Sequence, residues 1–426
     1  MDYGATWRNF RKAIHQFFME SECERNHVVL ANAEATQLMH DFLTNPTGHM
    51  VHTKRMSNSV IMSKIFGVRT ASADPKESPH MHDLYDMMEK WSAVVEVGAT
   101  PPVDVFPILH MLPEALFGNW IQRSVEVGKL MKTLYNSWQG KVDARRELAQ
   151  KTGVKGEETF MDLVLNQQEK MPLTQNQRDF LGGVLMEGGS DTTATMLLVV
   201  IQALTLNPDV LATAHAQMDA VVGEDRSPTW EDYEQLPYIA QIVKEAMRWR
   251  PVTPLSFPHA LTTDDIIDLG NGEKTFLPAG TTVMLNVWGL HHDEERFPNP
   301  DKFDPSRFEG RTKLAAEYAA SGDYEARDHY IYGAGRRICP GIHLAEREMW
   351  LATAKLVWGF NFNQATDNTG AKIPIDTNPT TGYSEGFLVC PKDFATCVTP
   401  RSEKRIETIK REFEKADKEI FVKYRG

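Results

Sequence analysis

The chain has 426 residues, of which 42% are hydrophobic and 24% are charged, and its formal net charge is −12 at pH 7. This is an ordinary globular composition, and the length is ample for a large buried core. The negative charge argues against a nucleic-acid-binding protein, because such proteins carry basic surfaces that neutralise phosphates.

The spacing of the cysteines and the length of the apolar segments exclude further classes of protein. Four cysteines (Cys23, Cys339, Cys390 and Cys397) are widely spaced, with neither a zinc-ligand pattern nor a disulfide framework, which fits a reducing compartment. We find no stretch of about 18 or more apolar residues, so we expect no transmembrane helix. The first residues resemble neither a signal peptide nor a transit peptide.

The first part of the chain is typical of helices. Helical spacing of apolar residues predicts helices over Trp7 to Met19, Val51 to Phe66, Ser78 to Val97, Phe117 to Glu147, Phe160 to Gln168 and Thr174 to Leu206, and from Pro208 and from Pro237 to Arg250. Thr174 suits the N-cap of the longest of these helices.

After Arg250 the pattern changes to frequent prolines and glycines with short β-like runs. Alternation predicts strands within Thr281 to Val287 and at Phe387 to Val389. The sequence therefore predicts a mainly α fold with small β-sheets, an α+β layout in which helix dominates.

Residues 401–426 are highly charged, with apolar residues such as Ile409 and Phe413 at roughly helical spacing. We expect a main body over residues 1–400 and a charged C-terminal helical tail over 401–426. The tail helix is expected to lie on the body, and a helix that binds a partner is the alternative.

One cysteine stands in a glycine-rich loop, Tyr332-Gly-Ala-Gly-Arg-Arg-Ile-Cys-Pro-Gly341. Gly333 and Gly335 allow a tight turn close to a flat ligand. Cys339 precedes an expected helix from Ile342 to Trp358, whose N-terminal end favours a thiolate. Such a thiolate can be the axial ligand of haem iron; a buried structural cysteine is the alternative.

A second candidate site lies midway along the expected Thr174 to Leu206 helix. Gly188 and Gly189 destabilise the helix by roughly 1 kcal/mol each relative to alanine. A helix that tolerates them often gains a close approach to a ligand or a local bulge. Asp191 and Thr192 place an acid and a hydroxyl beside that opening. A pair of packing glycines beside a polar kink is the alternative.

These motifs resemble those of the cytochrome P450 family, in family order over nearly the whole chain. Gly335, Arg337, Cys339 and Gly341 match the haem-binding signature, with Tyr332 where the family usually has Phe. The segments Arg248 to Pro254 and Phe257 to His259 resemble those of eukaryotic, fungal microsomal members. The resemblance implies a P450-like helical fold and haem b, with Cys339 as the axial ligand.

The resemblance also implies roles for further residues. Trp7, Arg11, His259 and Arg337 would meet the haem propionates, with the side chains of Trp7 and Arg11 on one helical face. Gly189 would lie against the cofactor, and Asp191 and Thr192 would deliver protons to bound oxygen.

Glu245 and Arg248, three residues apart, resemble the Glu-x-x-Arg helix of the family, joined by Arg307 in a structural triad. Without the resemblance, Glu245 and Arg248 are an ordinary exposed ion pair. The expected walls of the substrate pocket are Leu185, Met186, Leu255, Ser256, Phe257 and Tyr383.

The function implied is a haem-thiolate monooxygenase that oxidises a lipophilic small molecule with O2. Its electrons would come from NADPH-cytochrome P450 reductase, docked at Arg8, Lys12, Arg336 and Arg347. The fungal style favours secondary metabolism. The alternatives are a non-enzymatic haem binder or inactive truncated fragment, and a haem-thiolate isomerase or dehydratase.

The match begins almost at Met1, so we expect the membrane anchor and first elements of the family to be missing from this chain. The family implies the cytosolic face of the endoplasmic reticulum membrane. Without an anchor, the chain as written is expected to be cytosolic or peripheral.

Overall fold

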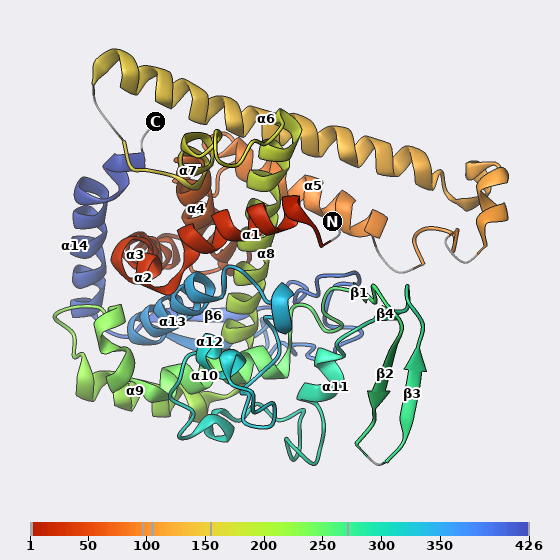
Figure 1. Cartoon of the computed structure of the whole chain (residues 1–426). Coiled ribbons are helices and arrows are strands. Elements are labelled where there is room, and N and C mark those ends of the chain that lie inside the picture. The colour runs from red at the N-terminus through yellow and green to blue at the C-terminus, as the bar shows by residue number, and fades with distance from the viewer. Residues whose placement is uncertain (1–2, 96–97, 104–105, 154–155, 271, 425–426) are drawn as a thin grey trace.

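The computed structural model describes residues 3–95, 98–103, 106–153, 156–270 and 272–424. Most of it is helical (Figure 1). The α-helices are α1 (Ala5–Phe18), α2 (Glu20–Glu22), α3 (Val28–Thr44), α4 (His49–Phe66), α5 (Pro79–Val95), α6 (Trp120–Thr152), α7 (Phe160–Asn166), α8 (Gln175–Leu206), α9 (Pro208–Val221), α10 (Pro237–Trp249), α11 (Val287–His291), α12 (Ala315–Ala320), α13 (Ile342–Gly359) and α14 (Glu403–Glu419).

The strands form small antiparallel pairs. They are β1 (His259–Ala260), β2 (Asp265–Asp268), β3 (Lys274–Leu277), β4 (Thr282–Val283), β5 (Phe360–Gln364) and β6 (Thr396–Pro400). β1 pairs with β4, β2 with β3, and β5 with β6. The predicted class, mainly α with small sheets, is confirmed.

Helix α8 runs through the middle of the molecule, with the long α6 crossing near one end of it and α14 at the edge (Figure 1). Its capping box confirms the predicted N-cap, because Thr174 accepts from the backbone N–H of Gln177. The C-terminal half of α8 is almost completely buried in the main hydrophobic core, together with α10 and α13. The core therefore fixes α8, and α8 carries one of the candidate sites.

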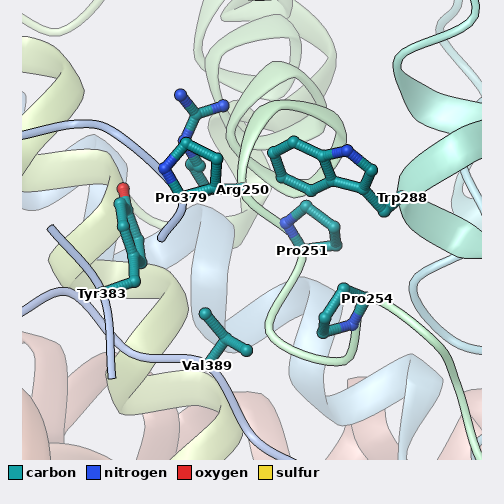
Figure 2. A pocket seen from close by; sticks show the side chains of 7 residues that line it. All are labelled: Arg250, Pro251, Pro254, Trp288, Pro379, Tyr383 and Val389. Carbon is teal, nitrogen blue, oxygen red and sulfur yellow. The ribbon is translucent and has the colours of Figure 1, made fainter. Parts of the chain in front are cut away.

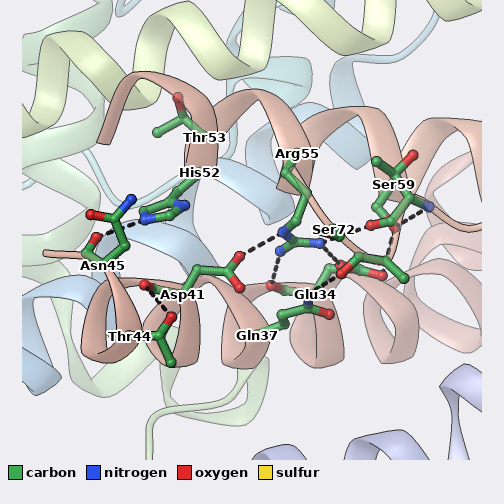
Figure 3. A network of polar contacts seen from close by, with 12 residues as sticks. Glu34, Gln37, Asp41, Thr44, Asn45, His52, Thr53, Arg55, Ser59 and Ser72 are labelled. Atoms are coloured by element: carbon green, nitrogen blue, oxygen red, sulfur yellow. Dashed lines mark hydrogen bonds and ion pairs between the residues drawn. The ribbon is translucent and has the colours of Figure 1, made fainter. Parts of the chain in front are cut away.

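A buried polar network holds α4 against α3 (Figure 3). Arg55 of α4 is 1% exposed and contacts two carboxylates of α3, with 2.6 Å to Glu34 and 2.6 Å to Asp41. Glu34 also accepts from Ser59 at 2.7 Å and from Arg69 at 2.7 Å. Because these charges are paired and hydrogen-bonded, α3 and α4 can stay fixed relative to each other without water between them.

A second buried brace leads toward the cysteine loop. Glu245 and Arg248 of α10 form a fully buried ion pair at 2.7 Å, and Arg307 lies 3.4 Å from the same carboxylate. Arg248 also donates to the carbonyl oxygen of His291, whose ring nitrogen accepts from the backbone N–H of Tyr330. The three residues expected to form a triad thus lie together, and they connect α10 to the segment just before Tyr332.

The expected helices are present, with ends shifted by a few residues, but the strands were harder to predict. The run from Thr281 to Val287 forms a strand only at β4. The strand predicted at Phe387 to Val389 is wrong: this segment is irregular, and the N–H of Val389 donates to the carbonyl of Val252 rather than to a strand. The sequence reasoning also missed α3 and the exposed β2–β3 hairpin.

Helix α14 lies on the body, as expected for the charged tail. Its Ile409 is fully buried, and the ring of Phe413 stacks on His40 of α3 with 4.1 Å between ring centroids. Arg405 pairs with Asp219 at 2.6 Å and with Glu224 at 2.8 Å. The division of the chain at residue 400 stays a prediction.

One helix of the described chain is long and apolar enough to cross a membrane. It is α8, whose most apolar 18-residue window has a mean hydropathy of 1.3. Length and composition alone meet this test, so the expectation that the chain has no transmembrane helix stays a prediction. However, 61% of that window is buried inside the protein, as in the core helix of a globular fold.

The buried position of Ile409 predicts that α14 contributes to the stability of the whole fold. Ile409→Ala should lower the free energy of unfolding by about 2 to 5 kcal/mol, because it leaves a cavity between α14 and the core. The exposed neighbour provides the control, and Lys410→Ala should change stability by less than about 0.5 kcal/mol. Equal denaturant midpoints for the two variants would show that α14 only rests on the surface.

The brace around Glu245 gives a second prediction. Glu245→Gln leaves the buried guanidinium of Arg248 without its counter-charge and should cost about 3 to 5 kcal/mol of unfolding free energy. The control is Lys302→Ala, which removes an exposed pair with Asp304 in the same region and should cost about 0 to 1 kcal/mol. Denaturant unfolding of both variants measures the difference, and a Glu245→Gln cost as small as that of Lys302→Ala would contradict the prediction.

Candidate active site

The cysteine loop turns tightly, as its glycines predict. Gly333 and Gly335 have φ values of 75° and 66°, in the left-handed region that favours glycine. The backbone N–H of Cys339 donates to the carbonyl of Tyr332 at 2.8 Å and closes the loop. Helix α13 begins at Ile342 with Gly341 as its N-cap, so Cys339 stands just before a helix N-terminus.

The surroundings of the Cys339 thiol act on its pKa in opposite directions. Burial raises the pKa of the thiol, whereas a backbone hydrogen bond from Gly341 and the positive charge of Arg11 lower it. Burial is the largest of these effects, so the group on its own favours the protonated form. A bound cation would reverse this balance, because a coordinating thiol loses its proton.

Helix α1 brings further donors to this loop. The guanidinium of Arg337 lies 4.8 Å from the centroid of the Trp7 ring, a cation–π contact between the loop and α1. Arg11 follows Trp7 by one turn; burial lowers the pKa of its guanidinium, and the charge of Cys339 acts in the opposite direction. The structure therefore brings Trp7, Arg11 and Arg337 together beside Cys339. His259, the fourth expected member, lies on the exposed strand β1.

The two glycines of α8 have different surroundings. A Cβ atom at Gly189 would lie 2.6 Å from Cγ1 of Ile61, so this glycine permits close packing of α4 on α8. Gly188 has open space around its Cα instead. The close approach at Gly189 is thus to a helix, and Gly188 is the glycine with room for a ligand.

Thr192 and Asp191 lie directly after this opening. The hydroxyl of Thr192 donates to the carbonyl of Gly188 at 2.7 Å, one turn back along α8. Burial raises the pKa of the Asp191 carboxyl, and the charge of Lys54 lowers it. A partly exposed hydroxyl and a carboxyl that burial moves toward neutral pH therefore stand beside the open face of α8.

The residues expected to form the substrate pocket divide between surface and core. Leu255 and Phe257 are 47% and 61% exposed, and Leu185 is partly exposed. Met186 is fully buried in the core cluster that contains Ile61 and Phe66, because adjacent residues of a helix point in different directions. Ser256 is a non-glycine residue with a positive φ, 54°, and such strain is found at functional sites.

Two aromatic residues of this region were not anticipated as site residues. The ring of Phe387 lies 4.6 Å from that of Phe257 and 6.5 Å from that of Trp91 on α5, measured between centroids. Three separate segments thus contribute rings to one wall. Trp91 has no sequence signal that distinguishes it from a helix residue facing the core.

Tyr383 lies deeper than expected, at 1% exposure, and its hydroxyl bonds to the side chain of Gln202. It lines an apolar cavity of about 150 Å³ with Arg250, Pro251, Pro254, Trp288, Pro379 and Val389 (Figure 2). Neither Cys339 nor any residue of α8 belongs to this lining, so the cavity is distinct from the candidate site.

The four basic residues expected to face a reductase are also divided. Arg8, Lys12 and Arg336 are exposed. Arg347 is fully buried and pairs with Glu20 at 2.9 Å and with Glu24 at 2.8 Å. The expectation that Arg347 contributes to a docking surface is therefore wrong, because its guanidinium already neutralises two carboxylates of the same chain.

Comparisons with known proteins agree with this arrangement. The cytochrome P450 family model matches residues 1–398. The chain is 60% identical to the cytochrome P450 monooxygenase yanC of Aspergillus niger over 424 residues, which cover 100% of this chain and 78% of that protein. It is 58% identical to the cytochrome P450 monooxygenase macC of Penicillium terrestre over 425 residues, with the same coverage.

Among solved structures, a zebra fish cytochrome P450 with abiraterone superimposes with a TM-score of 0.68 at 24% identity, covering 94% of this chain and 83% of that one. This likeness shows the fold. The family model and the fungal relatives show the family and its enzymatic character, and the family implies haem held by a thiolate. The chain belongs to the cytochrome P450 family and is a cytochrome P450 monooxygenase.

Proposed function

We propose that this monooxygenase oxidises a lipophilic small molecule of fungal secondary metabolism, and that Cys339 would hold the iron of its haem b. The observation that carries the proposal is the partly buried thiol of Cys339, which stands before α13 with the charge of Arg11 beside it. The names of the fungal relatives support the reaction class, and they do not specify a substrate.

The donor set around Cys339 fits haem. Among the described residues, no group of three His, Cys, Asp or Glu side chains is placed to hold a metal ion. A thiolate with cationic and indole donors nearby suits an iron centre that also carries carboxylates. Trp7, Arg11 and Arg337 would bind those carboxylates, and His259 would join them from β1.

When bound, the haem would supply the activation of O2 and the transfer of one oxygen atom to the substrate. Cys339 would hold the iron and donate electron density to it. Thr192 and Asp191, on the open side of α8, would hold and pass protons to the oxygen site. The hydroxyl of Thr192 already has an acceptor in the Gly188 carbonyl, so it can donate there or turn outward without leaving its rotamer well.

The substrate would lie between α8 and the aromatic wall of Trp91, Phe257 and Phe387. Aromatic rings give a large apolar contact area and favour flat, apolar ligands. Leu185 and Leu255 would extend this surface, and the strained backbone of Ser256 would fix the approach of its segment to Gly333. Met186 and Tyr383 would support the pocket from the core.

Electrons would come from NADPH-cytochrome P450 reductase at the face that carries Arg8, Lys12 and Arg336. These side chains lie on α1 and the cysteine loop, and Arg336 contacts Tyr3 next to α1. A positive face close to Cys339 would attract an acidic reductase despite the negative net charge of the chain. The family is often membrane-associated, and we propose the endoplasmic reticulum membrane, on its cytosolic side, as the place of action.

Replacement of Cys339 tests the haem proposal. The reduced carbon-monoxide difference spectrum of the native chain, expressed with a haem precursor, should show the red-shifted Soret band of thiolate ligation, and Cys339→Ser should abolish that band completely. Cys397→Ser is the matched control, because Cys397 is an exposed cysteine on β6, and it should keep the band. A thiolate band in Cys339→Ser, or its absence from the native chain, would refute the assignment.

Charge reversal tests the docking face. The double variant Arg8→Glu and Lys12→Glu should weaken reductase affinity at low salt by roughly tenfold, because each reversal replaces an attraction with a repulsion. The difference should shrink as salt screens the charges. The control reverses two exposed lysines of α14, Lys410→Glu with Lys415→Glu, which changes net charge equally. Unchanged affinity in the α1 variant, or an equal loss in the control, would exclude this face.

A further inference from the structure

Three successive carbonyl groups of α8 each accept a side-chain hydroxyl. The pairs are Thr192 Oγ1 to Gly188 O at 2.7 Å, Ser57 Oγ to Gly189 O at 2.8 Å, and Tyr85 Oη to Ser190 O at 3.3 Å. The donors come from α8 itself, from α4 and from α5. One turn of α8, immediately before Asp191, is thus held by hydroxyls from three helices.

These contacts add to the close packing of Gly189 against Ile61. Gly188 and Gly189 have no side chains of their own, so the backbone of this turn depends on contacts from neighbouring helices. Hydroxyls that bond to helix carbonyls draw those carbonyls away from the helix axis and shift the turn that carries them. Ser57 and Tyr85 therefore help to set the direction in which Asp191 leaves the helix.

Tyr85 also holds a cation at this place. The ammonium of Lys54 lies 4.6 Å from the centroid of the Tyr85 ring, and the Tyr85 hydroxyl lies 3.4 Å from the Lys54 carbonyl. A cation over an aromatic face is attracted to it. Lys54 and Asp191 are both partly exposed, and the charge of the lysine lowers the pKa of the carboxyl.

Burial also raises the pKa of other titratable groups near this place. Burial raises the pKa of Cys390 to about 11, with Asp191 adding to the rise. Burial raises the pKa of Glu348 on α13, which faces Tyr85, and it raises the pKa of Tyr85 itself. Lys54 is then the charged group that acts on the pKa of Asp191, and it acts against burial.

We propose that Lys54 and Tyr85 are positioning residues for Asp191. Tyr85 fixes the α8 turn and the lysine, and Lys54 supplies the counter-charge that lets the Asp191 carboxyl exchange protons with solvent. The inference rests on the proposed function, because it takes Asp191 as the residue that passes protons toward the oxygen site.

The direct test is the titration of Asp191 in the full chain. Aspartate labelled with ¹³C at the side-chain carboxyl reports protonation by NMR, in the diamagnetic reduced carbon-monoxide form where haem is bound, and Asp191→Asn assigns the resonance. Lys54→Met should move the midpoint to higher pH, because burial then acts on the carboxyl without an opposing charge. Lys54→Arg keeps the charge and should restore the native midpoint.

A second readout addresses Tyr85 without relying on Lys54→Met to fold. Tyr85→Phe should speed hydrogen exchange of the α8 amides just after Ser190 about tenfold, because the turn loses one of its hydroxyls. The matched control is Tyr135→Phe, which removes a hydroxyl bonded to Glu187 on the same helix, and it should leave those amides unchanged. Equal exchange in the two variants would overturn the role of Tyr85.

The enzymatic readout is the share of NADPH electrons that reaches product rather than hydrogen peroxide. Lys54→Met should lower this share about three- to tenfold, and Lys54→Arg should recover it. An unchanged Asp191 midpoint and an unchanged share in Lys54→Met, with the thiolate band intact, would overturn this inference alone. Loss of the thiolate band in the native chain would instead refute the proposed function, while the Asp191 titration would still test the electrostatic part.

Discussion

The close packing of α4 on α8 is the constraint on which the candidate site depends. It requires a glycine at position 189, because any side chain there would collide with Ile61. Once the two helices touch, Ser57 and Lys54 of α4 reach the α8 turn that carries Asp191. The buried pairing of Arg55 with α3 then fixes α4 from its other side, so contacts away from the site help to decide where the acid points.

Much of the fold could be predicted from the sequence, because the signals were local. Thr174 at a cap, Pro208 and Pro237 at helix starts and the glycines of the cysteine loop each act within a few residues of themselves. The motif around Cys339 was equally local, since a tight turn and a helix N-terminus are both written in consecutive residues. The grouping of Trp7, Arg11 and Arg337 needed the family resemblance to connect segments far apart in the chain.

What could not be predicted required knowledge of burial. Arg347 has the same charge as Arg336. The structure is needed to show that the charge of Arg347 is neutralised by ion pairs with Glu20 and Glu24. Helix α3 was missed because most of its residues are buried, so it lacks the two-sided pattern of a surface helix. Phe387 alternates like a strand, yet its ring is placed by Phe257 and Trp91, which belong to other segments.

The glycines of α8 also bear on the order in which the chain folds. Gly182, Gly183, Gly188 and Gly189 lie within one stretch, and each costs an isolated helix about 1 kcal/mol relative to alanine. This stretch cannot be expected to nucleate early by itself. Helix α4 is synthesised more than a hundred residues before α8. The face of α4 that packs on α8 therefore stays exposed until α8 has been synthesised, docks against it and becomes helical there.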